Sequence, residues 1–295
     1  MSSPESWTLG RLLEWTTKFL AEKEAESPRL DAEVLLAEAR GCKRIELYTA
    51  WDVEADERVR TAFRELVRRR SEGEPVAYLV GRKEFYSLDF HVNEHVLIPR
   101  PETEFLVVRL LDLVKAAAAS GSKAPEVSIA DIGTGSGVLA VCAAKHVPQS
   151  RVAAVDISEG ALAVASYNAQ QHGVAERVEF VQSDLFSAVP AERRFDFILS
   201  NPPYITTAEM EDLPATVRNF EPMAALHGGD DGLDVIRPLI TQSAERLKPG
   251  GHLLFEISPM LRDAVSALVA GDSCWQPPKF IPDLAGLPRV VELRK

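Results

Sequence analysis

The sequence predicts a chain in two parts, a helical bundle followed by an α/β domain built on a mostly parallel sheet. Apolar residues recur at helical spacing over residues 1–80. The segment 83–99 is rich in aromatic and β-branched residues, and from residue 102 strand-like and helix-like runs alternate. We therefore expect a helical domain over 1–82, an extended or hairpin linker over 83–100, and an α/β domain over 101–295.

The composition is that of a folded protein in a reducing compartment. Hydrophobic residues form 46% and charged residues 26% of the 295 residues, which allows a buried core and excludes a disordered chain. No apolar run reaches the ~18 residues of a membrane span. Cys42, Cys142 and Cys274 are far apart and odd in number, so we expect no disulfide and a cytoplasmic location. Neither these cysteines nor the histidines have metal-ligand spacing, so no metal is expected.

The charge balance argues against a nucleic-acid partner. The net charge is −11, and neither the first hundred residues nor the remainder is positively charged overall. Tight binding to a phosphate backbone needs a basic surface. The run Arg68–Arg70 is the local exception, but it falls in the last turn of a predicted helix, where basic residues complement the helix dipole. We interpret this run as a solvated helix end, and we expect a monomer without membrane contacts.

Three helices are predicted in the first part. Residues 9–15 place apolar side chains on one helical face. The second helix runs over Asp31–Ala39 and begins at Ser27-Pro28, because a capping serine followed by proline is typical of a helix start. The third runs over Asp56–Arg70.

The second part alternates helix and strand, which predicts a parallel sheet covered on both faces. A long apolar-faced helix opens it at Glu102–Ala119, and an antiparallel hairpin closes it with Lys279–Pro282 and Val290–Arg294. The other expected strands are Val127–Asp131, Val152–Asp156, Val178–Val181, Phe195–Ser200 and His252–Ile257, and the other expected helices are Gly137–His146 and Glu159–His172.

A glycine-rich loop follows the first strand of the expected sheet. The run Ala130–Gly137 lies at a strand-to-helix turn, where glycines let the backbone approach a ligand and the helix start offers free N–H groups. Asp156 ends the next strand, a position that suits a carboxylate binding the two hydroxyls of a ribose. The sequence therefore predicts a nucleoside site at this edge of the sheet.

The details of the loop resemble motif I of the S-adenosylmethionine-dependent methyltransferases. Val138 breaks the dinucleotide pattern G-x-G-x-x-G, and Asp131 beside the loop suits a cationic ligand. The resemblance implies a Rossmann-like fold with S-adenosylmethionine as cofactor. It also implies that Asp184 reaches the adenine amine and that its neighbour Leu185 lies on the base. The candidate cofactor-binding residues are Gly133, Thr134, Gly135, Ser136, Gly137, Asp156, Asp184, Leu185 and Asn201.

The turn Asn201-Pro202-Pro203-Tyr204 follows the fourth strand of the expected sheet and provides the candidate catalytic and substrate-binding residues. It resembles the N-P-P-[YFW] motif of methyltransferases that modify planar nitrogens. The asparagine Oδ1 and the first proline carbonyl can each accept one N–H of such a nitrogen, while the prolines stiffen the turn and preorganise both acceptors. Tyr204 can stack on a flat amide.

Further segments extend the resemblance to about residues 9–294. They are Arg29–Glu33, Glu84–Tyr86, Leu97–Glu104, Phe220–Pro222 and Leu226–Asp234. With the N-P-P-Y turn, the chain resembles the peptide-chain release factor glutamine methyltransferases, the HemK/PrmC family. The resemblance implies methylation of N5 of the glutamine in the Gly-Gly-Gln motif of class I release factors, with the N-terminal domain helping to hold that substrate.

Two positions depart from the family pattern, and the role of a third is open. Ser258 stands where the family usually has glycine, and relatives often carry a larger aromatic residue in place of Leu185. Glu102 is either directed toward the cofactor or a first-turn acid favoured by the helix dipole.

Three alternative functions remain at this stage. A ribosomal-protein glutamine methyltransferase shares the N-P-P-Y turn, although Pro101–Glu104 fits the release-factor enzyme better. An adenine-N6 nucleic-acid methyltransferase would use the same chemistry, but it needs a basic target-recognition surface. A non-catalytic scaffold that binds S-adenosylmethionine would have no use for the intact turn.

Overall fold

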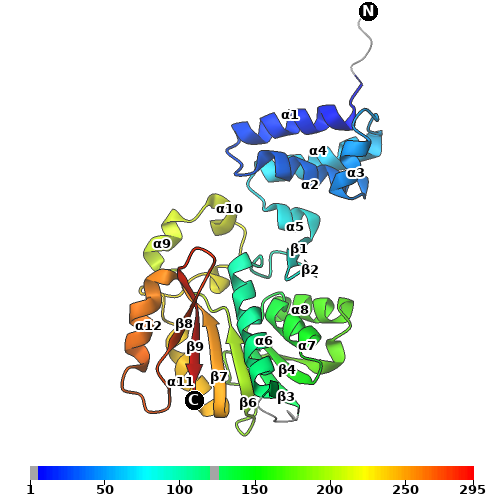
Figure 1. Cartoon of the computed structure of the whole chain (residues 1–295). Coiled ribbons are helices and arrows are strands. Elements are labelled where there is room, and N and C mark those ends of the chain that lie inside the picture. The colour runs from blue at the N-terminus through cyan, green and yellow to red at the C-terminus, as the bar shows by residue number, and fades with distance from the viewer. Residues whose placement is uncertain (1–5, 120–125) are drawn as a thin grey trace, which may run out of the picture. The chain divides into compact units, whose positions relative to one another are not determined.

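The computed structural model describes residues 6–119 and 126–295 and divides into two units (Figure 1). The first unit extends to Arg82 and includes Ala215–Phe220. The second comprises Lys83–Pro214 and Glu221–Lys295. Among the described residues, no helix combines the length and the apolar character needed to cross a membrane.

The first unit is helical, as the sequence predicts. Two of its longer helices begin at capping side chains: Thr8 accepts the N–H of Arg11 before α1, and Asp56 accepts that of Val59 before α4. The third, α2, begins at Pro28 after Ser27 as the sequence predicts, but the Ser27 side chain forms no capping hydrogen bond. Gly41 ends α2 with φ 70°, a left-handed conformation that glycine adopts without strain. The short helices α3 and α5 were not predicted. The elements of this unit are α1 (Leu9–Glu22), α2 (Pro28–Arg40), α3 (Arg44–Thr49), α4 (Glu57–Ser71), α5 (Val76–Val80) and α10 (Ala215–Arg218).

Apolar side chains of the first four helices form the core of this unit, with Leu13, Leu36, Leu47 and Phe63 almost fully buried. A buried carboxylate accompanies them. Glu33 accepts hydrogen bonds from Arg29, Arg44 and Tyr48, so its charge is balanced by two guanidinium groups.

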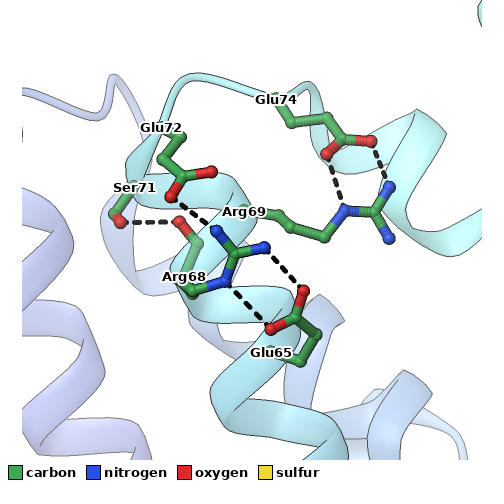
Figure 2. A network of polar contacts seen from close by, with 6 residues as sticks. All are labelled: Glu65, Arg68, Arg69, Ser71, Glu72 and Glu74. Carbon is green, nitrogen blue, oxygen red and sulfur yellow. Dashed lines mark hydrogen bonds and ion pairs between the residues drawn. The ribbon is translucent and has the colours of Figure 1, made fainter.

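The arginine run at the end of α4 is neutralised within the unit. Arg68 pairs with Glu65 and Glu72, and Arg69 pairs with Glu74 (Figure 2). Arg70 pairs with Asp31 on α2, with Nε and Oδ2 2.8 Å apart. Each guanidinium already has a carboxylate partner, which favours the interpretation of the run as a helix end over that of a nucleic-acid patch.

The ion pairs of this run differ in burial, and so they should differ in their contribution to stability. The Arg70 and Asp31 side chains are only 12% and 11% exposed, whereas Arg68 is 54% exposed. Arg70→Ala leaves a buried carboxylate without its cation and should lower the free energy of unfolding by about 1–3 kcal/mol. Arg68→Ala is the matched control and should cost clearly less than Arg70→Ala, since exposed pairs contribute little. Equal losses in urea unfolding would contradict this assignment.

The second unit is built on a seven-stranded sheet in the order β5-β4-β3-β6-β7-β9-β8. The strands from β5 to β7 are parallel, while β9 pairs antiparallel with both β7 and β8. The predicted parallel sheet with a terminal antiparallel hairpin is confirmed. The strands are β3 (Val127–Ile132), β4 (Ser150–Asp156), β5 (Val178–Gln182), β6 (Phe195–Ser200), β7 (Leu247–Glu256), β8 (Lys279–Pro282) and β9 (Pro288–Arg294).

Helices cover both faces of this sheet. Side chains of β3 point to opposite faces of the sheet. Ile129 packs on one face in the core with α6 and α7, and Ile132 packs on the other in the core with α11 and α12. The three helices predicted in this unit are confirmed within two residues, as α6 (Glu104–Ala119), α7 (Val138–His146) and α8 (Glu159–Gln171). The sequence analysis did not predict the bounds of α9 (Thr207–Asp212), α11 (Ile236–Arg246) and α12 (Arg262–Val269), nor those of the short 3-10 helices η1 (Pro101–Thr103), η2 (Ala175–Arg177), η3 (Met223–Ala225) and η4 (Pro259–Leu261).

A hairpin of β1 (Arg82–Phe85) and β2 (Leu88–His91) precedes the large sheet. Its turn residues Tyr86 and Ser87 both have positive φ, 50° and 59°, as the tight two-residue turns of hairpins require. Phe85 and Phe90 lie fully buried in the core of the second unit. The hairpin therefore packs as part of that unit.

Candidate active site

The predicted site residues follow the carboxyl ends of four adjacent parallel strands. The glycine loop follows β3, Asp156 ends β4, Asp184 lies just after β5, and Asn201 follows β6. In the sheet, Ile132 pairs with Ser200, so the loop and the Asn201 turn leave the sheet side by side. The next strand in the chain, β4, lies on one side of β3, and β6 lies on the other, so the strand order reverses at β3. Sheets of α/β proteins bind ligands at such a reversal.

A cavity of about 380 Å³ lies at this edge of the sheet, within the size range of small-molecule sites. Most of the predicted cofactor-binding residues line it, together with Pro203 of the N-P-P-Y turn. The predicted residues in its wall are Gly133, Thr134, Gly135, Ser136, Asp156, Asp184, Leu185 and Asn201. Pro202 and Tyr204 belong to the same turn but are not among the residues that line the cavity.

Gly137 differs from the other loop glycines, because it is not among the residues lining the cavity. It is the N-cap of α7 with φ 81°, and a Cβ on it would lie 3.0 Å from the Cβ of Ala165 on α8. Gly133 and Gly135 also have positive φ, but a Cβ on either would meet nothing within 4 Å. Close packing against α8 therefore explains the glycine at position 137. At Gly133 and Gly135, by contrast, the space beside the backbone is open and can admit a ligand.

The loop and Asp156 hold one another in place. The N–H groups of Gly133 and Thr134 donate to the Val155 carbonyl on β4. Asp156 accepts the Gly135 N–H at one carboxylate oxygen and the Ser158 N–H at the other, each at 2.9 Å. A carboxylate has about four lone-pair sites, so two acceptor positions remain for a diol in the cavity.

Asp131 lies beneath the loop with no exposed surface. Its Oδ2 accepts hydrogen bonds from the Thr134 hydroxyl and the Ala140 N–H, whereas its Oδ1 is buried without a hydrogen-bond partner. Burial raises the pKa of Asp131 to about 7, although those two hydrogen bonds oppose the rise. Asp131 is not among the residues that line the cavity, so its contacts act on the loop from below.

Asp184 and Leu185 form the wall beyond β5. Leu185 has φ 47°, in the left-handed region that non-glycine residues seldom adopt, and such strain is concentrated at functional sites. The loop is fixed by Ser183, whose N–H donates to the Asp156 carbonyl and whose hydroxyl accepts the Ala188 N–H.

The N-P-P-Y turn is held by a buried acid that the sequence analysis did not assign. Asn201 Nδ2 donates to the Thr103 hydroxyl at 3.2 Å, and that hydroxyl donates to Glu256 Oε2 at 2.6 Å. The Tyr204 hydroxyl donates to Glu256 Oε1 at 2.9 Å. These contacts leave Asn201 Oδ1 free of the turn's own bonds. The sequence did contain a signal for this role. Glu256 ends the buried apolar strand β7, and a buried carboxylate needs hydrogen-bond partners.

Two further motifs of the sequence analysis support the walls of the site. Glu221 accepts the Ile98 N–H at 3.0 Å and pairs with Arg100, which fixes the segment before η1. Gly232 has φ 73°, and a Cβ on it would lie 2.5 Å from the Tyr204 carbonyl oxygen. The glycine-rich segment around Gly232 therefore packs directly on the backbone of the N-P-P-Y turn.

Comparisons with known proteins agree with this arrangement. A family model of the PrmC N-terminal domain matches residues 11–81, and one of the methyltransferase small domain matches residues 113–221. A release factor glutamine methyltransferase of Rhodopirellula baltica is 49% identical over 294 residues, which cover 100% of this chain and 98% of that protein. A protein of the same name from Koribacter versatilis is 42% identical over 290 residues, with 98% and 99% covered. The chain belongs to the release factor glutamine methyltransferase family.

Solved structures share the fold of this family member at much lower identity. A methyltransferase from Pyrococcus furiosus covers 72% of this chain and 90% of its own, with 19% identity and a TM-score of 0.51. At this identity the likeness shows a methyltransferase-type fold alone, and it agrees with the Rossmann-like fold that the sequence predicts.

The structure also adds residues that sequence reasoning missed in this methyltransferase-family chain. Ile157 lines the cavity directly after Asp156 and is 62% exposed, and His95, Leu97 and Ala224 lie in the same wall. No local pattern marks them. Glu104 accepts the Tyr86 N–H at 2.8 Å and so supports the β1–β2 hairpin. The described residues contain no group of three or more histidine, cysteine, aspartate or glutamate side chains that could hold a metal.

The raised pKa of Asp131 gives stability a pH dependence that can be tested. The pKa is about 7 in the folded protein against about 3.9 when unfolded, so the folded state binds the proton more tightly. This residue therefore lowers stability as the pH rises from about 4 to about 7. Across that range, wild type should lose up to about 1.4 kcal/mol per pH unit relative to Asp131→Asn, which does not titrate. Denaturant unfolding between pH 5 and 8 measures it, and parallel curves would contradict the assignment.

Proposed function

We propose that the protein transfers a methyl group from S-adenosyl-L-methionine to the side-chain amide nitrogen N5 of the glutamine in the Gly-Gly-Gln motif of class I peptide-chain release factors. The observation that carries this proposal is the Asn201–Tyr204 turn beside the cavity, in a chain 49% identical over its length to a curated enzyme of that name. A ribosomal-protein glutamine methyltransferase is the alternative with the same chemistry.

The residues around the cavity fit the proposed cofactor. Asp156 offers two acceptor positions to the ribose hydroxyls, and Asp184 offers a carboxylate to the adenine amine. Leu185 and Ile157 provide apolar walls for the base. Asp131 supports this site from beneath, because it holds Thr134 of the glycine loop and the Ala140 N–H of α7. When bound, S-adenosylmethionine supplies an electrophilic methyl group on its sulfonium.

The N-P-P-Y turn addresses the main chemical difficulty, which is that an amide nitrogen is a weak nucleophile. Asn201 Oδ1 and the Pro202 carbonyl each accept one N–H of the substrate glutamine, so its NH2 group is held in one orientation. Preorganised acceptors of this kind stabilise the charge that develops on the nitrogen. Tyr204 provides an aromatic face, and burial and the neighbouring Glu256 raise the pKa of its hydroxyl, so it stays protonated.

The two units divide the work in this proposal. The second unit holds the cofactor and the reacting amide, and the first helps to hold the release factor. We also infer that the enzyme acts as a cytoplasmic monomer without nucleic acid or membrane as partner. The ion pairs of Arg68, Arg69 and Arg70 support the exclusion of nucleic acid, because they leave this run little net charge.

Transfer of labelled methyl groups tests the function and the role of Asn201 together. A release factor with an intact Gly-Gly-Gln motif should take up label, and the same factor with Gly-Gly-Glu should not. Asn201→Ala should reduce turnover by about 10²–10³, as expected for the loss of one preorganised hydrogen-bonding group, while cofactor affinity stays near wild type. Asn201→Asp keeps an acceptor and should fall between the two.

Three outcomes would refute the proposal: label on the Gly-Gly-Glu control, wild-type turnover in Asn201→Ala, or preferential labelling of adenine in added DNA. Ribosomal proteins added to the same assay test the alternative substrate, because preferential labelling of a ribosomal protein would favour that alternative. Mass spectrometry identifies the modified residue.

Asp156 provides an independent test of the cofactor site. Asp156→Ala removes the carboxylate proposed for the ribose hydroxyls, and hydrogen bonds to charged groups contribute about 1.5–3 kcal/mol. The dissociation constant for S-adenosylmethionine should rise roughly ten- to hundredfold. Calorimetric titration measures this change, and an unaltered affinity would remove Asp156 from the cofactor site.

A further inference from the structure

Three hydrogen bonds connect the N-P-P-Y turn to one buried acid, Glu256. Glu256 is 1% exposed and Thr103 is 2% exposed, so neither exchanges its partners for water. Glu256 accepts from Thr103 at one oxygen and from Tyr204 at the other, and the Thr103 oxygen accepts from Asn201 Nδ2. These residues come from η1, the β6 turn and the end of β7, which are far apart in the sequence.

The direction of these hydrogen bonds is fixed by the carboxylate. When Glu256 is ionised it can only accept, so the Thr103 hydroxyl donates its single proton to Glu256. The remaining lone pairs of that hydroxyl can then only accept. Asn201 must therefore present Nδ2 to Thr103, and its Oδ1 is left on the other side of the amide.

This direction matters because the two ends of an asparagine amide have nearly the same size. Packing alone discriminates poorly between Oδ1 and Nδ2, whereas a hydrogen-bond partner of fixed polarity does so strongly. A flipped Asn201 would direct N–H groups at the N–H groups of a substrate amide. The turn would then repel the group that it must hold.

We propose that Glu256 and Thr103 are positioning residues that fix the amide of Asn201 with Oδ1 toward the substrate. Glu256 acts through Thr103 and holds the Tyr204 ring with its second oxygen. This inference rests on the proposed function, since it assigns Asn201 Oδ1 to the substrate amide. It gives the buried glutamate at the end of β7 a role in turnover rather than in stability alone.

The surroundings of Glu256 make this device sensitive to pH. Burial raises its pKa, while the Thr103 and Tyr204 hydroxyls and the charge of Arg289 on β9 oppose the rise. Glu102 on η1 adds to the rise. When the pH falls and Glu256 takes up a proton, it can donate to Thr103, which is then free to donate to Asn201. Turnover should therefore fall with pH through this residue.

Substitutions at Thr103 test the proposal. Thr103→Val has nearly the same shape but no hydroxyl, and kcat on a release factor should fall at least about tenfold with little change in KM or in cofactor affinity. Thr103→Ser keeps the hydroxyl and should retain most of the activity. The double variant Thr103→Val/Asn201→Ala should be no slower than Asn201→Ala alone, because Thr103 acts through Asn201. The fall of kcat at low pH should be reduced in Thr103→Val.

Wild-type kcat in Thr103→Val, failure of Thr103→Ser to retain activity, or multiplied losses in the double variant would each overturn the inference. Should Thr103→Val not fold, Glu256→Gln provides the same test, because its amide can donate to Thr103 and remove the constraint. Its kcat should also fall, and wild-type kcat would overturn the inference. Wild-type turnover in Asn201→Ala would instead refute the proposed function, so the two failures are distinguishable.

Discussion

The parallel pairing of β3 with β6 is the constraint on which the site depends. Since Ile132 lies opposite Ser200, the residues that follow these strands begin at the same height and on neighbouring strands. One strand leads into the glycine loop and the other into the Asn201 turn. The chain has turned away from β3 in opposite directions, which opens the crevice between the two loops. A cofactor and a planar substrate group can thus be held side by side by backbone that the sheet already fixes.

Buried carboxylates secure the loops around this crevice, and each one does so by accepting specific donors. Asp131 holds Thr134 and the start of α7, Glu221 holds the segment before η1, and Glu256 holds the N-P-P-Y turn through two hydroxyls. Leaving any of these acids without its donors would be costly in an apolar interior. The loops therefore have few alternative conformations, which is the preorganisation that a reaction at a weak nucleophile needs.

The helical unit uses its charges differently. Arg68 forms exposed ion pairs with Glu65 and Glu72 (Figure 2). Arg70 forms a buried pair with Asp31, and the buried Glu33 accepts from Arg44. Two residues of the family-like segment Arg29–Glu33 are explained by these contacts, because Asp31 and Glu33 connect α2 to α4 and α3. These two residues of the family-like segment therefore stabilise the packing of the helices.

The sequence by itself determined the α/β class, the order of the strands along the chain and the position of the glycine-rich loop, because periodicity and glycine placement are local signals. It also marked Asn201–Tyr204 as the candidate for the substrate-binding turn. Tertiary structure alone decided what holds that turn. Thr103 lies 153 residues from Glu256 and 98 from Asn201, and Glu221 lies 123 residues from Ile98, so no local pattern records these contacts. Tertiary structure also decided that Gly137 packs against α8 and that Ile157 lines the cavity. Such roles depend on which distant surface a side chain meets, and that is settled only when the sheet brings its strands together.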